Sequence, residues 1–167
     1  TEAAEVHWRK ISYAVERGRE VNRILHMDKI YGGGDREKTW MGSSRNAVEE
    51  FWRSLIAGVA GVRFHRPESG VGISKKAQAA IRSVRLVEEQ VKFWEVEARQ
   101  DLLSAREQNE TYLAADPGSK YVLFFPSRGS VGLNLKDFPA AEFSIRWINI
   151  TDATSPVKGS ITGGKVV

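Results

Sequence analysis

The sequence contains no cysteine among its 167 residues. Disulfide bonds and thiolate metal sites are therefore excluded, because both need cysteine sulfur. The three histidines, His7, His26 and His65, do not have the spacing of metal ligands, and no cluster of carboxylates accompanies them in the sequence. We therefore expect neither a metal centre nor a cofactor.

The sequence also lacks a long apolar run and a strong excess of one charge. No stretch of about 18 consecutive apolar residues is present, so no segment is predicted to cross a membrane, and no signal peptide is recognisable. The formal net charge is +4, with basic and acidic residues interspersed. Interspersed charges are typical of a solvated surface, so we expect no nucleic-acid partner.

The composition is that of an ordinary globular chain, with 41% hydrophobic and 28% charged residues. In residues 1–98, helical and strand patterns alternate. One amphipathic helix is predicted to end near Gly18, a second to run from an N-cap at Asn46 to a C-terminal cap at Gly58, and a third to run from Ser74 to about Glu97. The second helix carries its apolar residues on one stripe: Val48, Phe51, Trp52, Leu55 and Ile56.

Two short strands are predicted between these helices, over residues 23–31 and 61–66, and Pro67 ends the second one. Alternating strands and helices are typical of a parallel sheet covered by helices. In residues 99–167 the pattern changes to the alternation of strands: residues 121–125 form an apolar run, and two alternating series follow. These series are Val131, Leu133 and Leu135, then Phe143, Ile145 and Trp147.

These patterns predict an α/β part, residues 1–98, followed by an all-β part, residues 99–167, that forms a small antiparallel β-sandwich. The two parts are expected to pack directly, because no low-complexity linker separates them. Residues 163–167 read as the beginning of a last strand, so we expect the sandwich to be incomplete.

Strand parity places polar residues together on the two predicted strands. Val62 and Phe64 share one face of their strand, while Arg63 and His65 share the other. The same parity on the first strand puts His26 and Asp28 on one face. If the apolar faces lie under helices, these four polar residues converge on one pocket. The alternative is purely structural, with Arg63 closing an ion pair and His65 bonding to backbone.

Other residues near the strands are weaker candidates. Tyr31 precedes a run of three glycines that lacks the lysine of a phosphate loop, and we interpret the run as a strand-exit loop. Trp40 could stack on a sugar ring from this loop. Three further tryptophans lie on apolar stripes and are predicted to be core residues: Trp52, Trp94 and Trp147.

Several runs of the sequence resemble one protein family. These runs are EEFWRSLIAGVAGVRFHRP, the following GVGIS, then NETYLAADPGSKYVLFFPSRGSVGLNL and FSIRWINI. Together they resemble bacterial glycoside-hydrolase-like proteins that consist of a (β/α)8 barrel and a small C-terminal β-sandwich, often labelled a collagen-binding domain. The resemblance extends from about Ile24 to Val167.

The resemblance implies that residues 24–31 and 61–66 are the seventh and eighth barrel strands. Arg63 and His65 would then line the barrel interior, and Arg66 the sugar-binding mouth. His26, Tyr31 and Trp40 would complete the carbohydrate contacts. Asp28 is the candidate catalytic carboxylate, although the family pattern leads us to expect a glutamate near that position.

A complete barrel takes about 250 residues, so the first six strands would lie outside this sequence. Glycoside hydrolysis uses two carboxyl groups, and we expect one of them to be missing here. The chain is thus interpreted as a C-terminal portion of a carbohydrate-active protein, inactive alone, whose parent is secreted or periplasmic. Two alternatives stay open: a carbohydrate- or protein-binding adhesion module, and a protein that completes its sheets by self-association.

Overall fold

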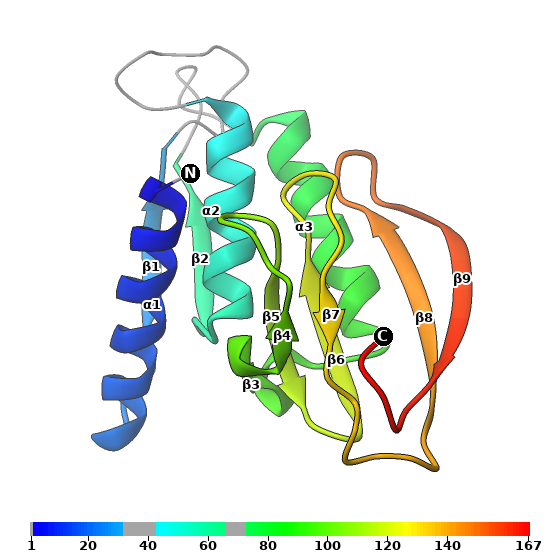
Figure 1. The fold of residues 1–167 in the computed structure, drawn as a ribbon. Helices are drawn as coiled ribbons and strands as arrows, with labels where there is room; N and C mark the ends of the chain where they lie inside the picture. The colour runs from blue at the N-terminus through cyan, green and yellow to red at the C-terminus, as the bar shows by residue number, and fades with distance from the viewer. Residues whose placement is uncertain (1, 32–42, 66–72) are drawn as a thin grey trace.

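The computed structural model describes residues 2–31, 43–65 and 73–167. The chain is a mixed α/β protein in which three helices alternate with two parallel strands, and a series of short antiparallel sheets follows (Figure 1). The parallel strands lie at one side of the molecule, and the last hairpin lies at the opposite side. This order confirms the predicted change from α/β to all-β structure, whereas a barrel is not shown.

The three helices are α1 (Glu2–Glu20), α2 (Ser44–Ile56) and α3 (Lys75–Glu88). The predicted N-cap at Asn46 is wrong: α2 begins after Ser43, whose hydroxyl oxygen accepts the Asn46 backbone N–H at 3.2 Å. A hydroxyl beside the first free N–H groups is an equally good cap, and it lies earlier in the chain. The predicted cap at Ser74 is confirmed by its bond from the Ala77 N–H.

The C-terminus of α2 ends as its sequence predicts. Gly58 has a φ of +96°, the left-handed conformation that glycine adopts at no steric cost. Its N–H donates to Leu55 O at 3.0 Å, and the next N–H, of Val59, donates to Ser54 O at 3.1 Å. This pair of bonds is the Schellman motif, which satisfies the last carbonyls of a helix and directs the chain toward the following strand.

The parallel sheet consists of β1 (His26–Ile30) and β2 (Gly61–Phe64). Met27 pairs with Val62, but Ile30 pairs with Phe64, so β1 contains one extra residue between these pairs. This bulge turns Ile30 toward the helices, where it is completely buried, although simple alternation would place it with His26 and Asp28. Phe64 stacks on Phe51 of α2 at 4.7 Å between ring centroids, so the predicted helix-facing side of β2 is confirmed.

The chain after α3 is built from short strands and two 3-10 turns. The central hairpin is β5 (Tyr112–Asp116) with β6 (Lys120–Phe124), and a second hairpin is β8 (Glu142–Asn149) with β9 (Thr154–Thr162). The remaining elements are short: the 3-10 turns Phe93–Glu95 and Gln100–Leu102, β3 (Glu97–Ala98), β4 (Leu103–Ser104) and β7 (Gly132–Leu133).

The strand predicted over residues 121–125 is confirmed by β6, and the alternation around Ile145 by β8. Residues 163–167, predicted to begin a strand, run beside β7. Leu133 and Val167 exchange both backbone hydrogen bonds, at 2.7 and 3.0 Å. The small sheets are therefore tied together by the final residues of the sequence.

Aromatic side chains join the α/β part to the strands that follow it. Trp52 of α2 is 2% exposed, and its ring lies 6.0 Å from that of Phe124 on β6. Trp8 of α1 lies 4.9 Å from Tyr112 on β5. These contacts belong to one continuous buried cluster, so the two predicted parts pack directly.

The predicted burial of two other tryptophans is wrong. Trp94 is 77% exposed, because α3 ends at Glu88 and not near Glu97, so the helical stripe does not continue to this residue. Trp147 is 51% exposed, because it lies on β8, whose apolar side is only partly covered. Only Trp52 of the three is a core residue.

A polar network crosses the junction between α1 and the strands. The Glu5 carboxylate accepts bonds from the Arg106 guanidinium at 2.7 Å, the Asn109 N–H at 2.6 Å and the Tyr112 hydroxyl at 3.3 Å. Burial acts to raise the pKa of Glu5, but these donors together outweigh it, and the net pKa is lowered. Burial, with the nearby Glu5 charge, raises the pKa of Tyr112 to about 12.

We predict that Glu5→Gln lowers the free energy of unfolding at pH 7 by about 1–2 kcal/mol, because it weakens charge-assisted bonds. Since the folded pKa of Glu5 is lower than the unfolded one, its contribution is complete above about pH 4.3 and falls as the pH drops through the folded pKa. Urea unfolding at several pH values should therefore show the difference from wild type shrinking in acid.

Glu16→Gln, at an exposed position of the same helix, is the matched control and should change stability very little. A difference between wild type and Glu5→Gln that is the same at pH 7 and pH 3 would contradict the proposed role of the Glu5 charge.

Candidate functional site

The polar residues predicted on the two parallel strands share the face that points away from α2. His26 and Asp28 come from β1, while Arg63 comes from β2 and His65 directly follows it. Because the strands are parallel, their carboxyl ends lie at the same edge of the sheet. Tyr31 and His65, which follow the two strands, therefore lie next to each other.

Direct contacts connect these side chains. His26 Nδ1 lies 3.1 Å from Asp28 Oδ1, and Arg63 Nε donates to the Asp28 backbone oxygen at 3.0 Å. The rings of Tyr31 and His65 stack with centroids 4.7 Å apart and planes at 22°. Five of the seven predicted site residues thus form two contacting groups at this sheet, one of His26, Asp28 and Arg63 and one of Tyr31 and His65. The other two, Trp40 and Arg66, lie outside the described residues.

This face is open in the structure. The side chain of Asp28 is 81% exposed and that of His26 is 55% exposed, while Arg63 is also exposed. The enclosed barrel interior expected around Arg63 and His65 is not shown. Among the described residues, Arg63 bonds to a backbone carbonyl and forms no ion pair with a carboxylate.

The chemical groups on this face suit hydrogen bonding more than bond cleavage. Arg63 donates, the Asp28 carboxylate accepts, and each histidine ring can do both. Asp28 is the only carboxylate in residues 23–31 and 61–65. Glycoside hydrolysis by either stereochemical route needs two carboxyl groups, so these two segments alone do not supply the catalytic pair.

Sequence reasoning found the polar residues of this face but missed the contact that positions them. Gly61 pairs with His26 across the sheet, and a Cβ at Gly61 would lie 2.3 Å from Cδ2 and Nε2 of the His26 ring. The glycine therefore provides the space in which the imidazole lies over β2. In the sequence, the signal for this contact was Gly61 itself, a glycine at the start of a predicted strand that carries polar residues.

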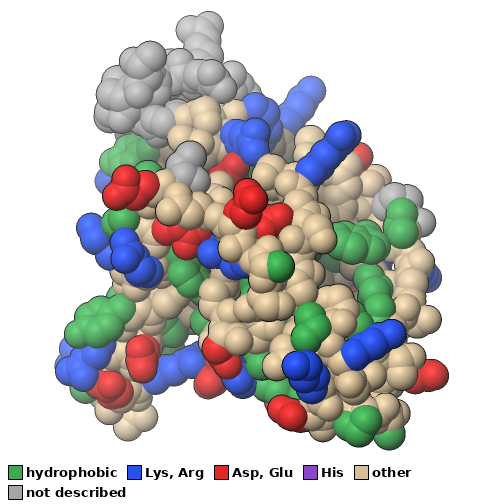
Figure 2. Space-filling view, in the orientation of Figure 1, with side chains coloured by type: hydrophobic (Ala, Val, Ile, Leu, Met, Phe, Trp, Pro, Cys, Tyr) green, Lys and Arg blue, Asp and Glu red, His purple; other side chains and the backbone are tan. Residues whose placement is uncertain are grey.

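Comparisons of the chain with family models, with curated proteins and with solved structures find no match. Within the described ranges, no helix is both long and apolar enough to cross a bilayer, and no three histidine or carboxylate side chains gather as metal ligands would. Basic and acidic side chains are interspersed on the face of the molecule shown in Figure 2. The geometry of the site itself is thus the basis for a functional interpretation.

We predict that Gly61→Ala moves the His26 ring away from Asp28, because the new methyl group would occupy the position of the ring. The ring is exposed and free to rotate outward, so the cost in stability should be only about 0.5 kcal/mol. Nuclear Overhauser contacts of the His26 ring, together with a thermal melt, test this.

Gly159→Ala is the matched control, since a Cβ there meets only Ile145 Cβ, at an ordinary 3.9 Å. An unchanged position of the His26 ring in Gly61→Ala would show that the side chain is not held as described.

Proposed function

We propose that this chain is the C-terminal part of a glycoside-hydrolase-like protein and that the β1–β2 face contacts carbohydrate. In this proposal β1 and β2 are the last two strands of a (β/α)8 barrel, and residues 99–167 form its β-sandwich. The observation that carries the proposal is the two-sided parallel sheet, with Ile30 and Phe64 against α2 and the polar residues on the opposite face.

The chemistry of the face suits a sugar. A sugar hydroxyl both donates and accepts hydrogen bonds, and Arg63 and Asp28 offer the complementary donor and acceptor side by side. The stacked pair of Tyr31 and His65 adds flat ring surface next to these groups, against which the C–H face of a sugar can pack. Their common position at the carboxyl ends of parallel strands is also where barrel proteins place their ligands.

Binding without hydrolysis is the activity that this chain supports best. Asp28 supplies one carboxylate, whereas both retaining and inverting mechanisms need a second one across the scissile bond. The second carboxylate would come from another part of the parent protein. The chain by itself is therefore proposed to contact sugar hydroxyls without cleaving the glycosidic bond.

We predict that a panel of mono- and oligosaccharides, titrated into ¹⁵N-labelled protein, shifts the backbone signals of β1 and β2. Arg63→Ala and Asp28→Asn should each weaken the observed binding about fivefold, the value of one lost hydrogen bond of roughly 1 kcal/mol. Lys136→Ala, at an exposed position in the second part, should leave binding unchanged. Shifts that spare β1 and β2, or an absence of binding to every sugar, would contradict the proposal.

Hydrolysis is tested separately with chromogenic glycosides and with polysaccharides. The expected result is no release of product by the chain alone. Cleavage that is abolished by Asp28→Asn would show that the chain contains a complete catalytic site, and the proposal of binding without hydrolysis would then be wrong.

A further inference from the structure

Two strands at the side of the molecule away from the β1–β2 face each leave one edge unpaired. β6 pairs only with β5, and β8 pairs only with β9. Within the described part of the chain, the outward backbone groups of residues 120–124 and 142–148 have no other backbone partner. Unpaired strand edges are templates on which another strand can form hydrogen bonds.

Ring contacts show how these two strands lie relative to each other. Tyr121 of β6 contacts Phe143 of β8 with centroids 5.4 Å apart, and Phe125, just after β6, contacts Trp147 at 5.8 Å. The residue numbers of both partners rise together from the first contact to the second, from Tyr121 to Phe125 and from Phe143 to Trp147. The two segments β6 and β8 therefore run parallel. Their backbones are nevertheless farther apart than neighbouring strands of one sheet.

A groove of about 1340 Å³ lies between them. Every residue of 119–128 and of 142–151 lines this groove. A strand that presents its face to a groove lines it with alternate residues, whereas a strand that presents its edge lines it with consecutive ones. The consecutive lining therefore indicates that the unpaired edges of β6 and β8 face the groove.

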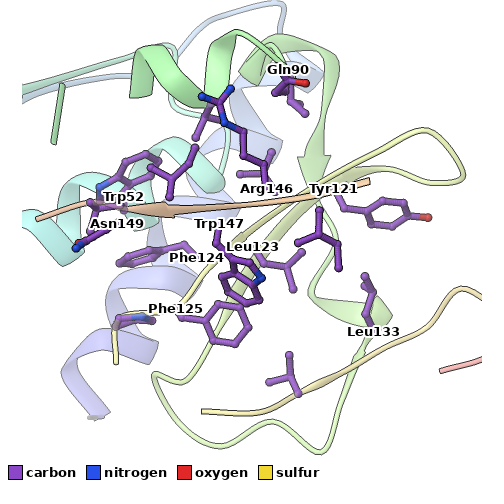
Figure 3. Close-up of a pocket in the computed structure, with 18 of the residues that line it drawn as sticks. Trp52, Gln90, Tyr121, Leu123, Phe124, Phe125, Leu133, Arg146, Trp147 and Asn149 are labelled. Atoms are coloured by element: carbon purple, nitrogen blue, oxygen red, sulfur yellow. The ribbon is translucent and has the colours of Figure 1, made fainter. Parts of the chain in front are cut away.

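The interior of the groove is mainly apolar. Figure 2 shows hydrophobic side chains gathered between the body of the molecule and the β8–β9 hairpin, and Figure 3 shows Trp52, Phe124, Phe125 and Trp147 around the groove. Trp52 is almost completely buried and its indole Nε1 is enclosed by the protein, so the apolar ring and not the N–H borders the groove.

One end of the groove carries an uncompensated positive charge. Arg128 follows β6 at this end, is exposed, and forms no ion pair with the described residues. In contrast, Arg146 is paired with Glu89 and Lys120 with Glu95. An occupant with a carboxylate at the Arg128 end would be complementary in charge.

We propose that this groove binds an extended polypeptide strand from outside residues 1–167, which inserts between β6 and β8 and runs antiparallel to both. The inserted strand would join β3, β5 and β6 with β8 and β9 into one antiparallel sheet. It carries apolar side chains at alternate positions for the groove interior. Its N-terminal end lies beside Arg128, because β6 ends there, and this end carries an acidic residue.

The test uses a synthetic heptapeptide that begins with aspartate and then alternates valine with threonine, titrated into ¹⁵N-labelled protein. The expected result is saturable binding with shifts in the amide signals of β6 and β8 and in the indole N–H of Trp52, assigned with Trp52→Phe. A second peptide has the same side chains but is N-methylated at alternate residues. N-methylation removes backbone N–H donors along one edge of the peptide but leaves its apolar surface in place. The N-methylated peptide should therefore bind at least tenfold more weakly than the unmodified heptapeptide.

Arg128→Glu tests the proposed direction of the strand. It should weaken binding of the aspartate peptide about two- to fivefold, as expected for an exposed charge pair, and leave unchanged the binding of a matched peptide that begins with asparagine. Equal effects on both peptides, or tighter binding of a peptide with its acidic residue at the C-terminal end, would overturn the antiparallel direction.

Three results would overturn the proposal as a whole. Equal binding of the N-methylated peptide would show that the groove is an apolar pocket and not a strand acceptor. No binding of the heptapeptide at millimolar concentration would show that the edges do not accept a strand. Dimerisation in light scattering without peptide, with the same amide shifts in β6 and β8 on concentration, would assign the groove to a second copy of this chain.

Discussion

The packing of Trp52 against Phe124 holds the two parts of the molecule together. Trp52 belongs to α2, which also covers β1 and β2, whereas Phe124 belongs to β6, one border of the apolar groove. The orientation of the β1–β2 face and the position of the groove edge therefore depend on the same buried indole. Truncation of a buried tryptophan costs about 3–5 kcal/mol, a large share of the stability of a domain of this size.

The sequence was sufficient to locate those helix ends that depend on a single capping residue. Gly58 and Ser74 terminate their helices through the backbone conformation and the hydroxyl that their residue types supply. The polar face of β1–β2 followed in the same way from the alternation of His26 with Met27 and of Arg63 with Phe64. In both cases the signal lies within a few residues of the feature.

Tertiary packing overrode local pattern at the end of α3. No glycine or proline occurs between Glu88 and Glu97, so helical periodicity predicted a longer helix. In the structure, Val91 and Phe93 pack against the core and Val96 is almost completely buried. These three side chains reach the core only if the helix ends before them. The β1 bulge that buries Ile30 has the same origin, since the packing of Ile30 into the core is a tertiary contact that the alternation of strand residues does not encode.

The two proposed binding surfaces share one physical cause. A parallel pair such as β1–β2 is ordinarily an interior part of a larger sheet, and here one of its faces is polar and exposed. Likewise, β6 and β8 are edge strands, and the gap between them is lined by Leu123, Phe125, Ile145 and Trp147. Lys120 and Arg146 on the same strands are already engaged in ion pairs. The unpaired edges of β6 and β8 favour an added strand more than a small apolar ligand, since only a strand offers regularly spaced carbonyl and N–H groups together with apolar side chains.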